Sequence, residues 1–280
     1  MLQDIWLNTA MTSIKISFSQ PAHRALSQQL SEELGLPLLE PLPDAKTLRS
    51  SQVCDYLLQY DDAGLSLRPC DRLSHGAVRC EFASGANSHR RRFGGGNGQA
   101  IAKAVGVSGK FAPKVLDLTA GLGADGFVLA GLGCDVRLLE RNPIVFSLLR
   151  DGLERARLAG QDDSELADIV ARMTLINTDA ASYLSNLKEG SYGDIVYMDP
   201  MFPERKKSAA VKKEMQAFHR IVGADPDASE LLDLALSCAR YRLVIKRPAS
   251  ASYLADRKPS YSLEGKSTRF DIFAHQKLPG

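Results

Sequence analysis

The sequence predicts an α/β fold in which a small α+β region at the N-terminus precedes a mostly parallel sheet covered on both faces by helices. Three observations lead to this prediction. Short apolar segments alternate with helical patterns through the second half of the chain. The apolar segment at residues 115–118 runs directly into the glycine-rich turn GLGADG. Acidic residues follow several predicted strands, at the ends where such sheets bind ligands.

Length and composition narrow the function classes. The 280 residues suffice for one large domain or for a core domain with a small appendage. The net charge is only +2, so a nucleic-acid partner must be argued from local basic patches. No apolar run is long enough to span a membrane, and no signal peptide is evident. The scattered cysteines predict a cytoplasmic protein with no metal site and no disulfide framework; they are Cys54, Cys70, Cys80, Cys134 and Cys238.

Residues 1–86 are predicted to form the small α+β region. Residues 14–18 alternate as a strand does. Pro21 opens a helical pattern that continues to residue 34 and stops at Gly35. A hairpin is expected over residues 56–67, and residues 78–82 could add a further strand.

Residues 87–110 are expected to form a basic, glycine-rich arm followed by a linking helix over residues 99–105. The arm contains HRRRFGGGNG, and its candidate RNA-contacting residues are Arg90, Arg91, Arg92 and Phe93. Arginines can contact phosphates, and an aromatic ring can stack on a base. The alternative is a plain linker with a solvated charge run.

Residues 111–280 are predicted to form the large α/β domain. After the first strand, further strands are expected over residues 135–139, 173–177, 194–198 and 242–246. Helical patterns cover residues 124–130, 143–158, 180–187 and 229–239. This alternation favours a parallel sheet. Two late strand-like segments, residues 260–263 and 269–274, could form a reversed pair that closes it.

The glycine turn contains Gly121, Gly123 and Gly126 and fits two kinds of cofactor site. It satisfies the dinucleotide pattern G-x-G-x-x-G, with Glu140 near the distance expected for a ribose-binding acid. It equally fits the first motif of class I methyltransferases, which bind S-adenosylmethionine. Asp117 favours the second, because its carboxylate precedes the glycines and can reach the cationic methionine end of that cofactor. The turn alone leaves both hypotheses open.

Two more strand ends carry acids. Glu140 can accept hydrogen bonds from both ribose hydroxyls, or it is only a helix-start charge before Asn142. Asp179 can accept the adenine amino group, or it is the N-cap of the next helix.

The tetrad DPMF at residues 199–202 favours a methyl transfer to a planar amine. Such an amine is a poor nucleophile, because its lone pair is delocalised into the ring. The Asp199 carboxylate and the Pro200 carbonyl can accept its hydrogens, and Phe202 can stack on the ring and hold it in line. The structural alternative is an Asp-Pro turn that ends a strand.

Basic residues surround this tetrad. Those that follow it face only Glu204 and Glu214, and they include the candidate RNA contacts Lys206 and Lys207. Lys246 and Arg247, at the end of a later strand, are two further candidates. Together with the arm, these residues could bring positive charge to the Asp199 site.

With these motifs in place, the sequence resembles the RsmJ family of 16S ribosomal RNA guanine-N2 methyltransferases. The motifs that carry the resemblance are HRRRFGGGNG, DLTAGLGADGFVLA, LLERNP, YMDPMFPERKKSAAVKKEM, VIKRP and RFDIF. The resemblance implies a class I, Rossmann-like fold and methylation of a guanine amino group in small-subunit ribosomal RNA, free or in the assembled subunit. It further implies that S-adenosylmethionine is held by Ala124, Asp125, Glu140, Arg141, Asp179, Ala180 and Asp199.

Three other functions compete with this one. A protein amide N-methyltransferase could use the same Asp-Pro-x-aromatic site, but it has little use for the basic arm. A nicotinamide-dependent oxidoreductase would bind NAD at the glycine turn. A non-catalytic RNA-binding module would not need Asp199.

Overall fold

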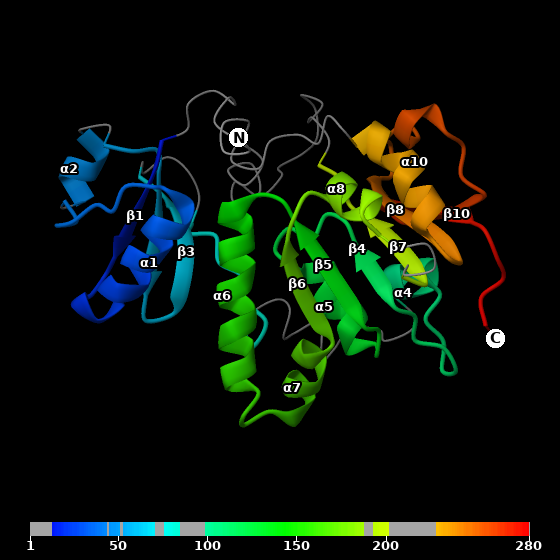
Figure 1. Ribbon diagram of the computed structural model, residues 1–280, viewed down its shortest axis with the longest axis horizontal. Coiled ribbons are helices and arrows are strands. Elements are labelled where there is room, and N and C mark those ends of the chain that lie inside the picture. The colour runs from blue at the N-terminus through cyan, green and yellow to red at the C-terminus, as the bar shows by residue number, and fades with distance from the viewer. Residues whose placement is uncertain are drawn as a thin grey trace. The chain divides into compact units, whose positions relative to one another are not determined.

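The computed structural model divides the chain into two compact units (Figure 1). The described residues are 13–43, 45–50, 53–70, 76–84, 99–187, 193–201 and 228–279. The small unit contains the described residues before Glu81 together with Met201, and the sheet unit contains those from Glu81 to Pro200 and from Ala228 onward.

The described residues of the small unit form a three-stranded sheet with two α-helices and a 3-10 helix. Its elements are β1 (Ile14–Phe18), the short 3-10 helix η1 (Pro21–His23), α1 (Arg24–Leu34), α2 (Ala45–Ser50), β2 (Tyr56–Asp61) and β3 (Gly64–Pro69). β2 and β3 form the predicted hairpin, and β1 pairs in parallel with β2. Helix α1 ends as predicted at Gly35, which takes a φ of 64°. Residues 78–82 do not form the further strand, since only Val78 bridges to Leu67.

The sheet unit contains a seven-stranded sheet of order β6-β5-β4-β7-β8-β10-β9. Its strands are β4 (Val115–Asp117), β5 (Val136–Glu140), β6 (Met173–Asn177), β7 (Ile195–Met198), β8 (Arg242–Pro248), β9 (Tyr261–Glu264) and β10 (Thr268–Ala274). β10 runs antiparallel to both β8 and β9, and the other neighbours are parallel. The predicted reversed pair therefore closes the sheet.

Helices cover both faces of this sheet. They are α4 (Ala100–Val105), α5 (Ala124–Gly131), α6 (Pro143–Ala159), α7 (Ser164–Ala171), α8 (Ala180–Ser185), α10 (Ala228–Cys238) and the 3-10 helix η3 (Leu254–Asp256). Right-handed crossovers put α5 and α6 on one face and α8 and α10 on the other. The contacts agree, because α7 touches α5 and α6, whereas α10 touches α8. Between the two layers, consecutive residues of the central strands are buried, as in parallel sheets generally.

Two α-helices of the sheet unit differ from the sequence expectation, and α2 of the small unit was not expected either. Helix α4 was expected in the linker but packs against β8 and β10, since Ile101, Ala102, Ala104 and Val105 are buried. Helix α7 was not expected. Its signal is present in the sequence: Asp163 caps it by accepting a hydrogen bond from the Leu166 amide at 3.0 Å. Leu166, Ile169 and Val170 then follow at helical spacing.

The sheet also fixes where a ligand should lie. From β4 the chain moves to β5 on one side, and after β6 it returns to β7 on the other side of β4. Ligands in open α/β sheets bind outside the carboxyl ends of the strands at such a switch point. The expected site therefore lies at the ends of β4 and β7. No described helix is both long enough and apolar enough to cross a membrane.

Candidate active site

The turn between β4 and α5 depends on its glycines. Gly121 and Gly123 have φ angles of 55° and 71°, in the left-handed region that side chains rarely adopt. At Gly126 the constraint is packing, because an added Cβ would lie 2.5 Å from Cδ2 of Leu138 on β5. An added Cβ at Gly121 meets no described atom within 4 Å. The turn is thus packed on its inner side and open at Gly121.

Glu140, at the end of β5, holds this turn in place. Its side chain is buried, and its two carboxylate oxygens accept hydrogen bonds from the backbone amides of Gly121 at 2.9 Å and Asn142 at 2.7 Å. Asn142, rather than Glu140, caps helix α6, since its Oδ1 accepts from the amides of Ile144 and Val145. Glu140 therefore does more than place a charge at the start of a helix, and its predicted contact with the ribose hydroxyls stays a prediction. A carboxylate has about four acceptor positions, so further hydrogen bonds are compatible with these two.

Asp179, after β6, is an N-cap, as the alternative interpretation predicted. Its Oδ1 accepts a hydrogen bond from the Ser182 amide at 2.9 Å and so caps helix α8. Its Oδ2 lies 4.0 Å from Nη1 of Arg141. The Asp179 carboxylate therefore caps a helix, and its contact with the adenine amino group stays a prediction.

Thr119 connects the ends of β4 and β7. Its hydroxyl accepts a hydrogen bond from the Asp199 amide at 2.7 Å, and its own amide donates to Oδ1 of Asp117 at 3.1 Å. The backbone at Asp199 is therefore fixed relative to the glycine turn. No local pattern in the sequence points to Thr119, because its role depends on the pairing of β4 with β7.

Three acidic side chains interact electrostatically at this point, and we call Asp117, Asp125 and Asp199 the carboxylate cluster. Lys246, on β8, donates hydrogen bonds to Oδ2 of Asp125 at 2.7 Å and to Oδ2 of Asp199 at 2.8 Å. The Tyr197 hydroxyl donates to Oδ2 of Asp125 at 2.7 Å. The cluster thus joins β4, α5, β7 and β8.

Burial sets the charge state of the cluster. Burial of Asp117 raises the pKa of its carboxyl to about 8, and the neighbouring carboxylates add to the shift. Burial also raises the pKa of Tyr197 well above its usual value, so its hydroxyl is a neutral donor. For Lys246, burial lowers the pKa, but the attraction of Asp125 and Asp199 outweighs it and the net shift is upward. Lys246 is therefore a cation at physiological pH.

Comparisons with known proteins identify the family. A sequence model of a family of SAM-dependent methyltransferases matches residues 41–275. The chain is 52% identical over 255 residues to ribosomal RNA small subunit methyltransferase J of Cellvibrio japonicus, covering 90% of this chain and 94% of that protein. The protein of the same name from Pseudomonas aeruginosa strain PAO1 is 48% identical over 252 residues, covering 90% and 91%.

The chain belongs to the ribosomal RNA small subunit methyltransferase J family. A crystal structure of a SAM-dependent methyltransferase from Neisseria gonorrhoeae agrees, with 35% identity, a TM-score of 0.68 and coverage of 93% of this chain and 95% of that one. The predicted class I methyltransferase fold, the enzyme class and the cofactor are confirmed. The oxidoreductase hypothesis is dropped.

The residues of this methyltransferase fit S-adenosylmethionine on chemical grounds. The cofactor carries positive charge at its sulfonium and ammonium groups, and the cluster sets three carboxyl groups against the ammonium of Lys246. Asp117, Glu140 and Gly121 all lie at this end of the sheet, as predicted. Ala124 opens helix α5 and Asp125 lies in its first turn. No three or more described His, Cys, Asp or Glu side chains are placed to hold a metal ion.

Two of the expected RNA contacts have other partners. Lys246 bonds to the carboxylate cluster, so we reassign it to the site itself. Arg247 is only 5% exposed, and its Nη2 donates to the backbone oxygen of Ser252 at 2.7 Å. A buried guanidinium cannot reach a phosphate at the surface, so we remove Arg247 from the RNA-contacting set. Pro200 is buried directly after Asp199.

The remaining predicted contacts lie outside the described residues and stay predictions. They are Arg90, Arg91, Arg92, Phe93, Phe202, Lys206 and Lys207.

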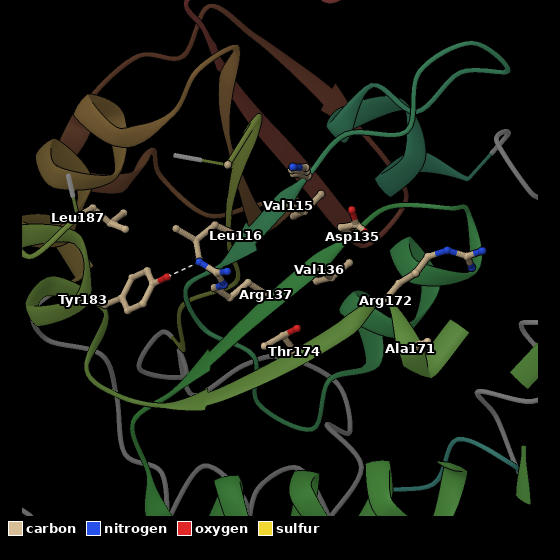
Figure 2. A pocket seen from close by; sticks show the side chains of 12 residues that line it. Val115, Leu116, Asp135, Val136, Arg137, Ala171, Arg172, Thr174, Tyr183 and Leu187 are labelled. Carbon is tan, nitrogen blue, oxygen red and sulfur yellow. Dashed lines mark hydrogen bonds between the residues drawn. The ribbon is translucent and has the colours of Figure 1, made fainter. Parts of the chain in front are cut away.

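A cavity of about 400 Å³ lies at the other end of the same strands (Figure 2). Val115 and Val136, which line it, are the first residues of β4 and β5. Arg137 extends from β5 to the hydroxyl of Tyr183 on α8, at 2.7 Å (Figure 2). None of the predicted site residues lines this cavity, so it is separate from the candidate active site.

Proposed function

We propose that this chain transfers a methyl group from S-adenosylmethionine to the exocyclic N2 amine of a guanine in 16S ribosomal RNA. The observation that carries the proposal is the placement of Asp199. Asp199 follows β7 at the switch point of the sheet, where its backbone amide donates to the Thr119 hydroxyl and its carboxylate accepts from Lys246. The relatives named ribosomal RNA small subunit methyltransferase J support ribosomal RNA as the substrate class.

Asp199 is suited to activating an amine. Its side chain is 40% exposed, so a substrate can reach it, while its Lys246 partner is 27% exposed. By accepting an amine hydrogen, the carboxylate lets the nitrogen become tetrahedral and frees its lone pair for attack. When bound, the cofactor supplies the methyl group on a cationic sulfur. As the amine nitrogen gains the methyl group, its proton would pass to Asp199 or to water.

Other residues would hold the cofactor. We assign the ribose hydroxyls to Glu140, whose position beside Gly121 is fixed by its backbone hydrogen bonds. Asp117 would face the cationic methionine end of the cofactor. A cation at that position would favour the ionised form of the Asp117 carboxyl group. Asp179 and Arg141 would lie near the adenine, with Ala124, Asp125 and Ala180 supplying backbone contacts.

The RNA partner would be the 16S strand, either free or in the assembled small subunit. The arm at Arg90, Arg91, Arg92 and Phe93, with Lys206 and Lys207, would contact its phosphates and bases. We place the activity in the cytoplasm, where the described cysteines remain free thiols.

Mapping of ribosomal RNA modifications by mass spectrometry tests the proposal. Cells that lack the gene should lose one N2-methylguanine from 16S RNA, and the purified protein should restore it with S-adenosylmethionine. An unchanged set of N2-methylguanines in those cells would contradict the proposal. Asp199→Ala provides the matched control, because it removes the acceptor and leaves the rest of the chain unchanged.

A further inference from the structure

Lys246 lies beside Asp199 because of the strand register. Parallel pairing of β7 with β8 places Met198 opposite Ile245, so the next residue of each strand, Asp199 and Lys246, also come side by side. The same ammonium reaches Asp125 in the first turn of α5. One cation thus joins the strand that carries Asp199 to the helix that follows the glycine turn.

On the basis of the proposed function, we propose that Lys246 is a positioning residue for methyl transfer, which keeps the Asp199 carboxylate ionised and correctly oriented. The alternative role, a contact to an RNA phosphate, was the one expected from the sequence.

Charge is the first argument. The groups that face one another here are Asp117 from β4, Asp125 from α5, Tyr197 and Asp199 from β7, and Lys246 from β8. Carboxylates that share a site raise one another's pKa, and a cation within hydrogen-bonding distance has the opposite effect. Tyr197 contributes a neutral hydrogen bond, so it cannot offset this repulsion. The ammonium of Lys246 can, because it bonds to two of the carboxylates directly.

The geometry of the site supports the same role for Lys246. The side chains of Asp125, Lys246 and Asp199 are 16%, 27% and 40% exposed, in that order. Lys246 therefore supports Asp199 from the interior, and the Asp199 carboxylate is the more exposed of the two side chains. The Asp199 amide is bonded to Thr119, and its Oδ2 is bonded to Lys246. Fixing both the backbone and the carboxylate limits the directions in which Asp199 can accept an amine hydrogen, and such positioning accelerates a transfer reaction.

The test is a double-mutant cycle with Lys246→Met, Asp199→Asn and the double variant. Single-turnover methyl transfer to 16S RNA is measured at saturating cofactor and RNA between pH 5 and 9. Lys246→Met should slow the reaction about tenfold at neutral pH and move the acid limb of the pH–rate profile upward by about one unit. In the Asp199→Asn background, Lys246→Met should slow methyl transfer by less than about twofold, because the carboxylate that Lys246 acts on has been removed.

Lys246→Arg keeps the charge and checks that charge is what matters. We expect its acid limb to stay within about half a unit of wild type, with the rate only several-fold lower. If Lys246→Met does not fold, Lys246→Arg still tests the proposal. An acid limb that moves as far in Lys246→Arg as predicted for Lys246→Met would overturn the proposal.

A measurement without cofactor or RNA gives an independent readout. Thermal unfolding of Lys246→Met should show a loss of stability that grows as pH rises and the carboxylates ionise. Lys110→Met, at an exposed lysine in the loop before β4, is the matched control and should show no such trend. A loss that is equal at all pH values would overturn the charge role.

Two further outcomes would overturn the proposal. Equal slowing by Lys246→Met in both backgrounds would mean that Lys246 does not act through Asp199. Weaker RNA binding with a shallower salt dependence and a normal single-turnover rate would make Lys246 a phosphate contact. Failure of the wild-type protein to methylate 16S RNA would contradict the proposed function, whereas the pH dependence of unfolding would still decide the charge role of Lys246.

Discussion

The two ends of the central strands of the sheet differ in chemistry. At the carboxyl ends of β4, β5 and β7, the acids Asp117, Glu140 and Asp199 are held by specific hydrogen bonds. At the amino ends, the cavity of about 400 Å³ is lined by the cations Lys114, Arg137 and Arg172 together with Asp135. Arg137 there is exposed, whereas Asp117 and Glu140 are buried.

This difference shows that the volume of a cavity does not by itself locate the site. The amino end offers space, but Asp135 and Arg137, which line it, are exposed to solvent. The carboxyl end fixes a turn, a carboxylate cluster and a strand end by hydrogen bonds that cross between elements. Because catalysis depends on groups held in place before the substrate arrives, we assign function to the carboxyl end.

The largest effect is expected for Asp199→Ala. Removing an acceptor that strengthens in the transition state should lower the single-turnover rate of methyl transfer by about 100-fold or more. RNA affinity should stay near normal, because the hydrogen bond that is lost strengthens only in the transition state. Asp199→Asn should retain weak turnover, since its amide oxygen can still accept a hydrogen. A near-normal rate for Asp199→Ala would remove the carboxyl end as the catalytic site.

Glu140→Ala should have the next largest effect, on cofactor binding. It removes the acceptor proposed for the ribose hydroxyls and also releases the amides of Gly121 and Asn142. Loss of a hydrogen bond to a charged group costs about 1.5–3 kcal/mol, which is about tenfold or more in affinity. Isothermal titration calorimetry with S-adenosylmethionine measures this, and Glu140→Gln should lose less. An unchanged dissociation constant would exclude Glu140 from the cofactor site.

The same comparison shows what the sequence could and could not predict. The glycine turn and the acids at strand ends are local patterns, so they were predicted correctly from a strand, a turn and a helix in succession. The partners of Lys246 were not, because they depend on which residues β8 places beside β7. The burial of Arg247 was missed because it depends on the chain after β8, where the backbone oxygen of Ser252 accepts its hydrogen bond, and on the pairing of β8 with β10. Asp179 remained ambiguous, since one carboxylate can cap a helix and face a ligand at once.

Asp117→Asn tests the electrostatics of the carboxyl end through stability. The pKa of Asp117 is raised to about 8 in the fold, above its usual value near 4. Between these values the unfolded chain releases the proton and the folded protein retains it, so the free energy of unfolding falls as pH rises. The fall is up to about 1.4 kcal/mol per pH unit for one group.

The side-chain amide introduced by Asp117→Asn has no proton to lose in this range, so the variant should show a weaker pH dependence in the cofactor-free protein. Its melting temperature should exceed that of wild type increasingly between pH 5 and 8, while its cofactor affinity should be lower. Thermal unfolding across that range is the measurement. A constant difference between the two proteins at every pH would mean that Asp117 is already ionised in the fold.

The smallest effect is expected at the amino end, for Arg137→Ala. Arg137 is exposed, and its hydrogen bond to Tyr183 contributes about 0.5–1.5 kcal/mol at most to stability. Arg137 is the second residue of β5, while Glu140 is the last residue of the same strand. We therefore expect cofactor affinity and the methyl-transfer rate to stay within about twofold of wild type, with a small drop in melting temperature. Tyr183→Phe removes the same hydrogen bond without removing the charge, so the two variants should have similar stability. If Arg137→Ala weakened RNA binding severalfold while Tyr183→Phe did not, the positive charge of the amino end would contact the RNA, and the division between the two ends would be wrong.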